Sequence, residues 1–139
     1  MPRAAGDVSA NLELIRTATD ALNAHDLDAC VGYITPDFII HLAELPEPLQ
    51  GRETWRQNAE LMRRAFPDLT ARIDGILASG DEVALRLVFT GTHSGEFLGH
   101  PATGRTVRWI SHEFYRIADG LIAEEWICSD TFSLMQQVS

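Results

Sequence analysis

The segment from Arg108 to Tyr115 carries side chains whose types and spacing suit acid/base chemistry. In a β-strand, alternate side chains point to opposite faces. One face would hold Trp109, Ser111, Glu113 and Tyr115, and the other Ile110, His112, Phe114 and Arg116. If the first face lines a cavity, Glu113 is a carboxylate between two aromatic rings, where burial raises its pKa towards that of a base working near neutral pH. The alternative is an outward-facing Glu113 in a solvated cross-strand pair, and His112 would then face the cavity as the acid/base group.

Asp130 and His41 are further candidates for an acid/base role. Asp130 follows Trp126 by four residues, so it shares the parity of Trp126 along a strand unless a bulge intervenes. It could face the cavity, or it could cap a closing helix. His41 is the one polar residue of the apolar segment Phe38–Leu42, where it is either structural or a pocket residue. Aromatic residues predict the wall of the ligand site: Trp109, Tyr115 and Trp126.

The chain lacks the motifs of metal-dependent, nucleophilic and nucleotide-binding enzymes. His93 and His100 flank a glycine-rich loop at a spacing that matches no metal site, and no HExxH or CxxC occurs. There is also no GxSxG, P-loop or GxGxxG pattern. We therefore predict neither a metal nor an organic cofactor. The glycine-rich loop is a candidate lid, because its glycines permit hinge motion.

Length and charge restrict the class of protein. A chain of 139 residues forms one ordinary domain, here 1–139 with residues 1–8 as a frayed leader. A net charge of −9 repels phosphate backbones and anionic lipid, which argues against nucleic acid and membrane partners. No apolar stretch is long enough for a membrane span or a signal peptide. Cys30 and Cys128 form no CxxC and are predicted to be free thiols in a cytoplasmic protein.

Hydrophobic periodicity predicts helices first and a run of strands afterwards. Apolar residues at helical spacing predict three helices. The first follows Ser9 as its N-cap, the second follows Asp26, and the third runs from residue 51 until Pro67 ends it. A short strand is predicted at 37–42 and a loop at 43–50. Period-2 patterns follow at 69–78, 82–93, 105–117 and 121–129, and a helix closes the chain. This order predicts an α+β fold in which a curved, mostly antiparallel sheet wraps around the N-terminal helices and leaves a cone with one open mouth.

Several segments, in order along almost the whole chain, resemble the SnoaL-like polyketide cyclases of the nuclear-transport-factor-2-like superfamily. The matching segments are LPEPLQGRE at 45–53, AFPDL at 65–69, GTHSGEFLG at 91–99, PATGR at 101–105, YRIADG at 115–120, EEW at 124–126, Asp130, and LMQQ at 134–137. The resemblance implies a cone-shaped α+β barrel and a homodimer paired through its outer sheet faces. It also implies an intramolecular aldol-type ring closure of a polyketide ester without metal or cofactor.

The chain departs from the aldol-closing members at their acid/base pair. Ile127 stands where they carry Asp, and Glu113 stands where they carry His. Three functions therefore remain open: a cyclase with Glu113 as base assisted by His112, His41 or Asp130; a related hydrolase, dehydratase or isomerase; and a non-catalytic binder. In each case the expected ligand is a hydrophobic small molecule. The residues predicted to contact it are Trp109, Ser111, Tyr115, Trp126 and Ile127.

Overall fold

The computed structural model describes residues 7–139, so most of the predicted leader at 1–8 lies outside the described residues. Helix α1 (Val8–Asn23) begins two residues earlier than the sequence indicated. Its N-cap is Asp7, whose carboxylate accepts a hydrogen bond of 3.2 Å from the Ala10 N–H, so the prediction of Ser9 as cap is wrong. Both residue types make good caps, and the carboxylate is the one that reaches the free backbone N–H.

The remaining elements follow the predicted order of helices and then strands. They are α2 (Leu27–Gly32), β1 (Ile34–Leu42), β2 (Leu49–Gln50), α3 (Arg52–Ala65), β3 (Thr70–Ser79), β4 (Glu82–Thr92), β5 (Thr106–Ala118), β6 (Leu121–Ser129) and α4 (Thr131–Val138). Asp26 caps α2 as predicted, through a 3.0 Å hydrogen bond to the Ala29 N–H. The segment 43–50 is not loop throughout, because Leu49 and Gln50 pair with β1.

The strands form one sheet in the order β2-β1-β6-β5-β4-β3. All neighbouring pairs are antiparallel except β1 and β6, which run parallel. The sheet is curved but does not close, since β2 and β3 are its two edges. The predicted α+β fold is confirmed, and the word barrel applies only loosely to this open sheet.

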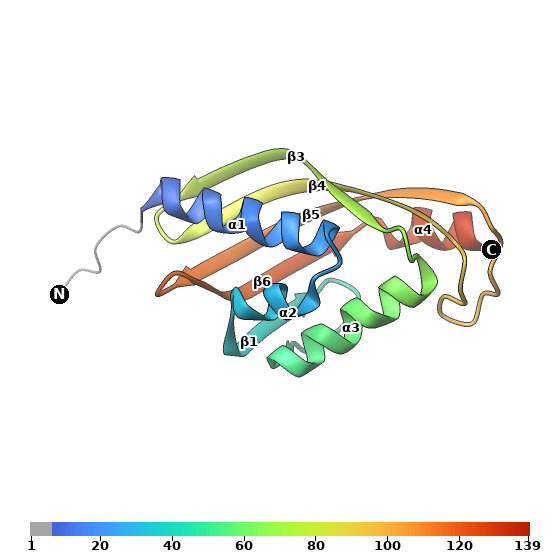
Figure 1. The fold of residues 1–139 in the computed structure, drawn as a ribbon, viewed down its shortest axis with the longest axis horizontal. Coiled ribbons are helices and arrows are strands. Elements are labelled where there is room, and N and C mark those ends of the chain that lie inside the picture. The colour runs from blue at the N-terminus through green and yellow to red at the C-terminus, as the bar shows by residue number, and fades with distance from the viewer. Residues whose placement is uncertain (1–6) are drawn as a thin grey trace.

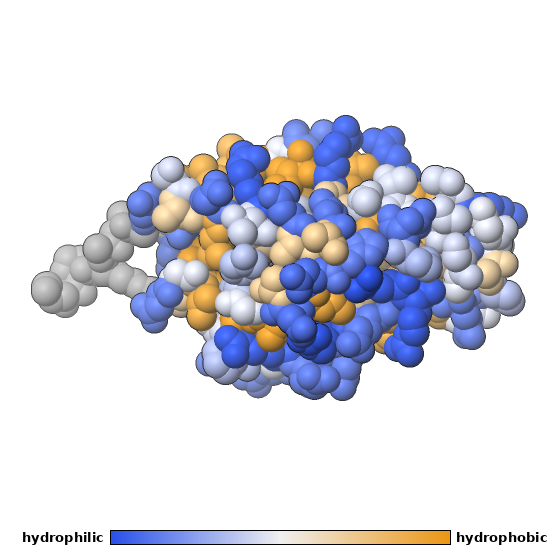
Figure 2. Space-filling view, in the orientation of Figure 1, coloured by the Kyte–Doolittle hydropathy of each residue, from blue (hydrophilic) through white to orange (hydrophobic). Residues whose placement is uncertain are grey.

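The helices cover the concave face of the sheet (Figure 1). Helix α1 lies along β3 and β4, α2 and α3 lie across the other half, and α4 lies at the end where the β4–β5 loop projects. Hydrophilic side chains dominate the surface on this side, with apolar residues showing between them (Figure 2). The main core beneath joins α1 to the inward faces of the strands through residues such as Ile15, Phe38, Ile40 and Val83.

Burial along β5 alternates strictly and decides which face lines the interior. Residues 107, 109, 111, 113 and 115 are buried, whereas 106, 108, 110, 112 and 114 are exposed. The face with Glu113 therefore points towards the helices, the first of the two arrangements considered from the sequence. His112 points away from the interior.

The glycine-rich loop between β4 and β5 is anchored at its start. His93 is fully buried, and the Ser94 and Gly95 N–H groups donate to the Ala65 carbonyl at 3.0 and 3.1 Å. A Cβ at Gly95 would stand 2.1 Å from the Arg64 carbonyl oxygen, so only glycine fits there. At this end glycine serves close backbone packing rather than the hinge motion proposed from the sequence.

Candidate functional site

An interior cavity of about 430 Å³ lies between the concave face of the sheet and the helices. Its wall is largely apolar and includes Trp55 and Met62 from α3, Phe89 from β4 and Trp109 from β5. Trp109 stacks on Phe89 with ring centroids 5.3 Å apart. Such a volume and lining suit an apolar small molecule. Trp109, Ser111, Glu113, Tyr115 and Ile127 all lie on the predicted inward face.

Glu113 is the most tightly held polar group of this cavity. It is 8% exposed, its Oε2 accepts a 2.7 Å hydrogen bond from the Ser111 hydroxyl, and its Oε1 accepts one from the Tyr115 hydroxyl. Ser129 lies 2.9 Å from Ser111, oxygen to oxygen, and extends this network to β6. Burial raises the pKa of Glu113, and the two hydrogen bonds partly offset that rise. Burial also raises the pKa of Tyr115, which therefore acts as a hydrogen-bond donor.

Glu125 is a second buried carboxylate of the cavity, and the sequence analysis missed it. It is 5% exposed and pairs across the β5–β6 hairpin with Tyr115, two residues along from the pairing of Glu113 with Ile127. Burial first, and then the charge of Glu113, raises the pKa of Glu125 well above its usual range. Pairing across the hairpin turn could have predicted this position. If Ile127 faces Glu113 in the cavity, alternation along the strand also places Glu125 inside and Trp126 outside.

Trp126 and His41 lie together on the outer face of the sheet. Their rings stack with centroids 4.9 Å apart and planes 5° from parallel, and Trp126 is 38% exposed. The predicted place of Trp126 in the ligand wall of the cone is thus wrong, because its strand neighbours Glu125 and Ile127 take the inward positions. His41 also lies on the face of the sheet opposite Glu113, so it does not line the cavity with Glu113 as predicted.

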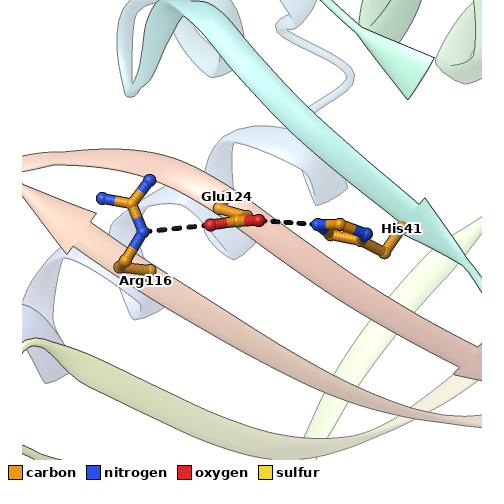
Figure 3. Close-up of polar contacts among 3 residues, drawn as sticks. All are labelled: His41, Arg116 and Glu124. Carbon is orange, nitrogen blue, oxygen red and sulfur yellow. Dashed lines mark hydrogen bonds and ion pairs between the residues drawn. The ribbon is translucent and has the colours of Figure 1, made fainter. Parts of the chain in front are cut away.

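On that outer face, a short polar chain links three strands (Figure 3). His41 Nε2 lies 2.6 Å from Glu124 Oε2, and Arg116 Nε donates to Glu124 Oε1 at 3.1 Å. Although partial burial opposes ionisation, the hydrogen bonds from His41 and Arg116 lower the pKa of Glu124. Glu124 is therefore an ionised structural carboxylate, whereas its neighbour Glu125 faces the cavity.

The outer face also holds an open hollow of about 760 Å³, lined by residues that include His41, Leu77, Phe114 and Trp126. It is larger than the interior cavity, and Glu113 borders both. The Glu113 side chain lies on the buried, inward face of β5, whereas the outer-face side chains of His112 and Arg86 are exposed to solvent. The exposed apolar side chains are more typical of a surface that contacts another protein. We place the candidate site in the interior cavity, where the carboxylates are buried.

Asp130 serves as a helix cap and not as a cavity residue. Its carboxylate accepts a 3.0 Å hydrogen bond from the Ser133 N–H at the start of α4, and the residue is exposed. Of the acid/base candidates named from the sequence, the structure leaves only Glu113 in the cavity. His112, His41 and Asp130 lie elsewhere, so they are not brought together with it.

Within residues 7–139, no three His, Cys, Asp or Glu side chains gather as a metal-binding group. In the same range, no helix has the length and apolar character needed to cross a membrane. Cys30 is buried and Cys128 is exposed, and both are free thiols as predicted. Burial raises the pKa of the Cys30 thiol to about 11, so it is not a reactive thiolate.

Comparison with known proteins identifies the family. The sequence profile described as SnoaL-like polyketide cyclase matches residues 12–138. The chain belongs to the SnoaL-like polyketide cyclase family. Among curated relatives, the aklanonic acid methyl ester cyclase AcmA of Streptomyces galilaeus is 28% identical over 83% of this chain and 81% of its own length. DnrD of Streptomyces peucetius, named for the same activity, is 29% identical over 84% and 82%.

Solved structures of this SnoaL-like type share the fold. IdmH, a candidate polyketide cyclase from Streptomyces antibioticus, superposes with a TM-score of 0.81 at 36% identity and covers 91% of this chain and 96% of its own. AclR, a candidate hydroxylase from Streptomyces galilaeus, gives a TM-score of 0.87 at 29% identity over 95% and 82%. Proteins that share this fold are thus named for different reactions. The reaction must therefore be inferred from the residues of the site and not from the fold.

Proposed function

We propose that this SnoaL-like protein is a cofactor-independent enzyme that closes a ring of a polyketide ester by an intramolecular aldol-type condensation. The supporting observation is Glu113, a buried carboxylate in an apolar cavity whose two oxygens accept hydrogen bonds from Ser111 and Tyr115. Relatives named as ester cyclases support the substrate class. The two free thiols support the cytoplasm as the site of action.

The chemistry needs only a positioned base and a proton donor. Glu113 removes a proton from a carbon flanked by two carbonyl groups, and the C–H electron pair becomes an enolate. The enolate carbon attacks a ketone carbonyl of the same molecule, and the new alkoxide takes up a proton. Holding both ends of the substrate in one cavity replaces a bimolecular encounter with a step inside one complex. The desolvated Glu113, with its raised pKa, suits a base working near neutral pH.

The cavity wall provides the orientation. Trp109 and Ile127 flank the position of Glu113 on the two hairpin strands and present apolar surface to the substrate. Ser111 and Tyr115 fix the direction of the carboxylate from the same strand. A rigid strand pair holds a base more accurately than a loop would, which favours catalysis that depends on alignment.

The test is Glu113→Gln, assayed with aklanonic acid methyl ester, the compound in the relatives' names. General-base catalysis typically supplies about 10²–10⁴-fold, so kcat should fall by at least 100-fold. Glu124→Gln is the matched control. It is the same substitution in the same β5–β6 hairpin, but it removes a carboxylate from the outer face and leaves the cavity unchanged. If the Glu113→Gln enzyme keeps its activity within about tenfold, roughly 1.4 kcal/mol of barrier, Glu113 is not the base.

Addition of water to an epoxide or a double bond is a second candidate reaction. The pair of buried carboxylates favours it, because one carboxylate can activate water while another group protonates the leaving oxygen. Product mass separates the two reactions. Ring closure by aldol addition is an isomerisation that leaves the mass unchanged, whereas hydration incorporates oxygen from ¹⁸O-labelled water. If Glu113→Gln and the unaltered protein bind hydrophobic ligands equally and neither reacts, the protein is a binding module.

A further inference from the structure

We propose that Glu113 and Glu125 act as an acid–base pair that holds one proton between them, with Glu113 as base and Glu125 as the protonated donor to the new alkoxide. The inference rests on the proposed ring closure and assigns a catalytic role to Glu125. Both carboxylates lie on the inward face of adjacent strands and line the same cavity. Diagonal neighbours in an antiparallel pair stand roughly 7–8 Å apart at their backbones, within reach of two glutamate side chains or a bound substrate.

The surroundings of the two carboxylates differ in a way that assigns the proton. Glu113 accepts hydrogen bonds at both oxygens, from Ser111 and Tyr115, and each bond stabilises the ionised form. Glu125 is 5% exposed, and no hydrogen bond reaches its carboxyl group from the described residues. A buried carboxyl group with no donor nearby is more stable as the neutral acid.

Charge balance leads to the same assignment. Arg63 and Glu44 also line the cavity, but the Arg63 guanidinium donates a 3.0 Å hydrogen bond to the His25 carbonyl and none to Glu113 or Glu125 among the described residues. Burial and the neighbouring negative charge of Glu113 both raise the pKa of Glu125, with burial the larger cause. Two carboxylates in one apolar cavity, neither paired with a cation, ionise one at a time.

The pair completes a balanced reaction without any further reagent. The carbon acid passes its proton to Glu113, the enolate forms the new C–C bond, and the alkoxide takes the proton of Glu125. At the end Glu113 is protonated and Glu125 is ionised. Transfer of the proton from Glu113 to Glu125 restores the starting state, so the substrate is isomerised with no net gain or loss of protons. Ile127 replaces the acidic residue of the family's position, and Glu125, two residues away on the same face of β6, thereby supplies the polar partner.

The experiment has one readout independent of turnover. Infrared spectroscopy at pH 7 detects the carbonyl stretch of a protonated carboxyl group and its shift in D₂O. We expect this band in the unaltered protein and in Glu113→Gln, and its loss in Glu125→Gln. Glu124→Gln, altered on the outer face of the sheet, should keep it. Absence of the band from the unaltered protein, or its loss in Glu113→Gln alone, would overturn the assignment without any need for the variants to be active.

The second readout separates enolate formation from ring closure. In D₂O, aklanonic acid methyl ester exchanges the hydrogen between its carbonyl groups whenever the base works. Glu125→Gln should keep this exchange within about tenfold and lose ring closure by at least 100-fold, whereas Glu113→Gln should lose both. If Glu125→Gln closes the ring at the normal rate, the donor role is wrong and the proposed function stands. If the unaltered protein neither exchanges nor closes the substrate, the proposed function fails, and the infrared result still decides whether the carboxylates share a proton.

Discussion

Replacing Glu124 and Glu125 one at a time should change the pH dependence of folding in opposite directions, although the two residues are adjacent. Glu125 is buried in the cavity, and its pKa lies well above the usual range because of burial and the charge of Glu113. Glu124 faces outwards with a lowered pKa, since its hydrogen bonds to His41 and Arg116 outweigh its partial burial. Each substitution by Gln keeps the shape and removes the ionisable group.

For Glu125 the folded protein keeps a proton that the unfolded chain releases at the same pH. The free energy of unfolding therefore falls as the pH rises from the ordinary glutamate pKa through the raised one. Within that window the loss is about 1.4 kcal/mol for each pH unit and each retained proton. With an unfolding entropy of about 2.1 cal/mol/K per residue, this corresponds to roughly 5 °C in Tm per pH unit. The Gln amide does not titrate, so Glu125→Gln should match the unaltered protein near pH 5 and exceed its stability at pH 8.

For Glu124 the lowered pKa gives the opposite sign. Its stabilisation is fully present above the ordinary glutamate pKa and is lost as the pH falls through the folded value. Glu124→Gln should therefore be less stable than the unaltered protein at neutral pH, and the difference should narrow on acidification. Thermal melts of the three proteins in steps from pH 3 to 8 measure both effects. Parallel profiles for the two variants, or a constant offset of Glu125→Gln from pH 5 to 8, would refute the retained proton.

Three further predictions concern packing, capping and assembly. Gly95→Ala should destabilise the protein by about 1–3 kcal/mol in denaturant titrations, because its Cβ would meet the Arg64 carbonyl oxygen at 2.1 Å. Gly32→Ala, which meets nothing within 4 Å, is the control and should be neutral, and equal effects of the two would contradict the packing argument. Asp130→Ala should cost about 1 kcal/mol in stability through the lost α4 cap, while kcat remains normal; a large loss of kcat with an intact fold would restore Asp130 to the site. We also expect a homodimer paired through the outer face, with light scattering giving twice 15.4 kDa for the unaltered protein and the monomer mass for Leu77→Asp, whose side chain is 74% exposed there. A monomeric unaltered protein at working concentration would end that proposal.

Local patterns in the sequence were enough for the succession of elements and for the grouping of side chains on the two faces of β5, whereas burial in the structure decided which face is inward. Helical spacing and Pro67 predict the helices, and the change to period 2 predicts the hairpins, because both periods follow from backbone geometry alone. Strict alternation along β5 then put Glu113 with Trp109, Ser111 and Tyr115, as the structure confirms. The family resemblance was confirmed by the profile match over residues 12–138. The catalytic role of Glu113 stays a prediction.

Relations across strands needed the tertiary structure. Alternation says that neighbouring side chains face opposite ways, but only the pairing of β6 with β5 and β1 decides that Glu125 and Ile127 point inwards and that Trp126 stacks on His41 outside. A shift of one residue in that register would reverse every assignment on the strand. The same holds for Asp130, because the bond to the Ser133 N–H depends on where β6 ends and α4 begins. The pKa shifts of Glu124 and Glu125 differ in sign for this reason: two identical side chains, adjacent in the chain, meet opposite surroundings once the sheet curves over the helices.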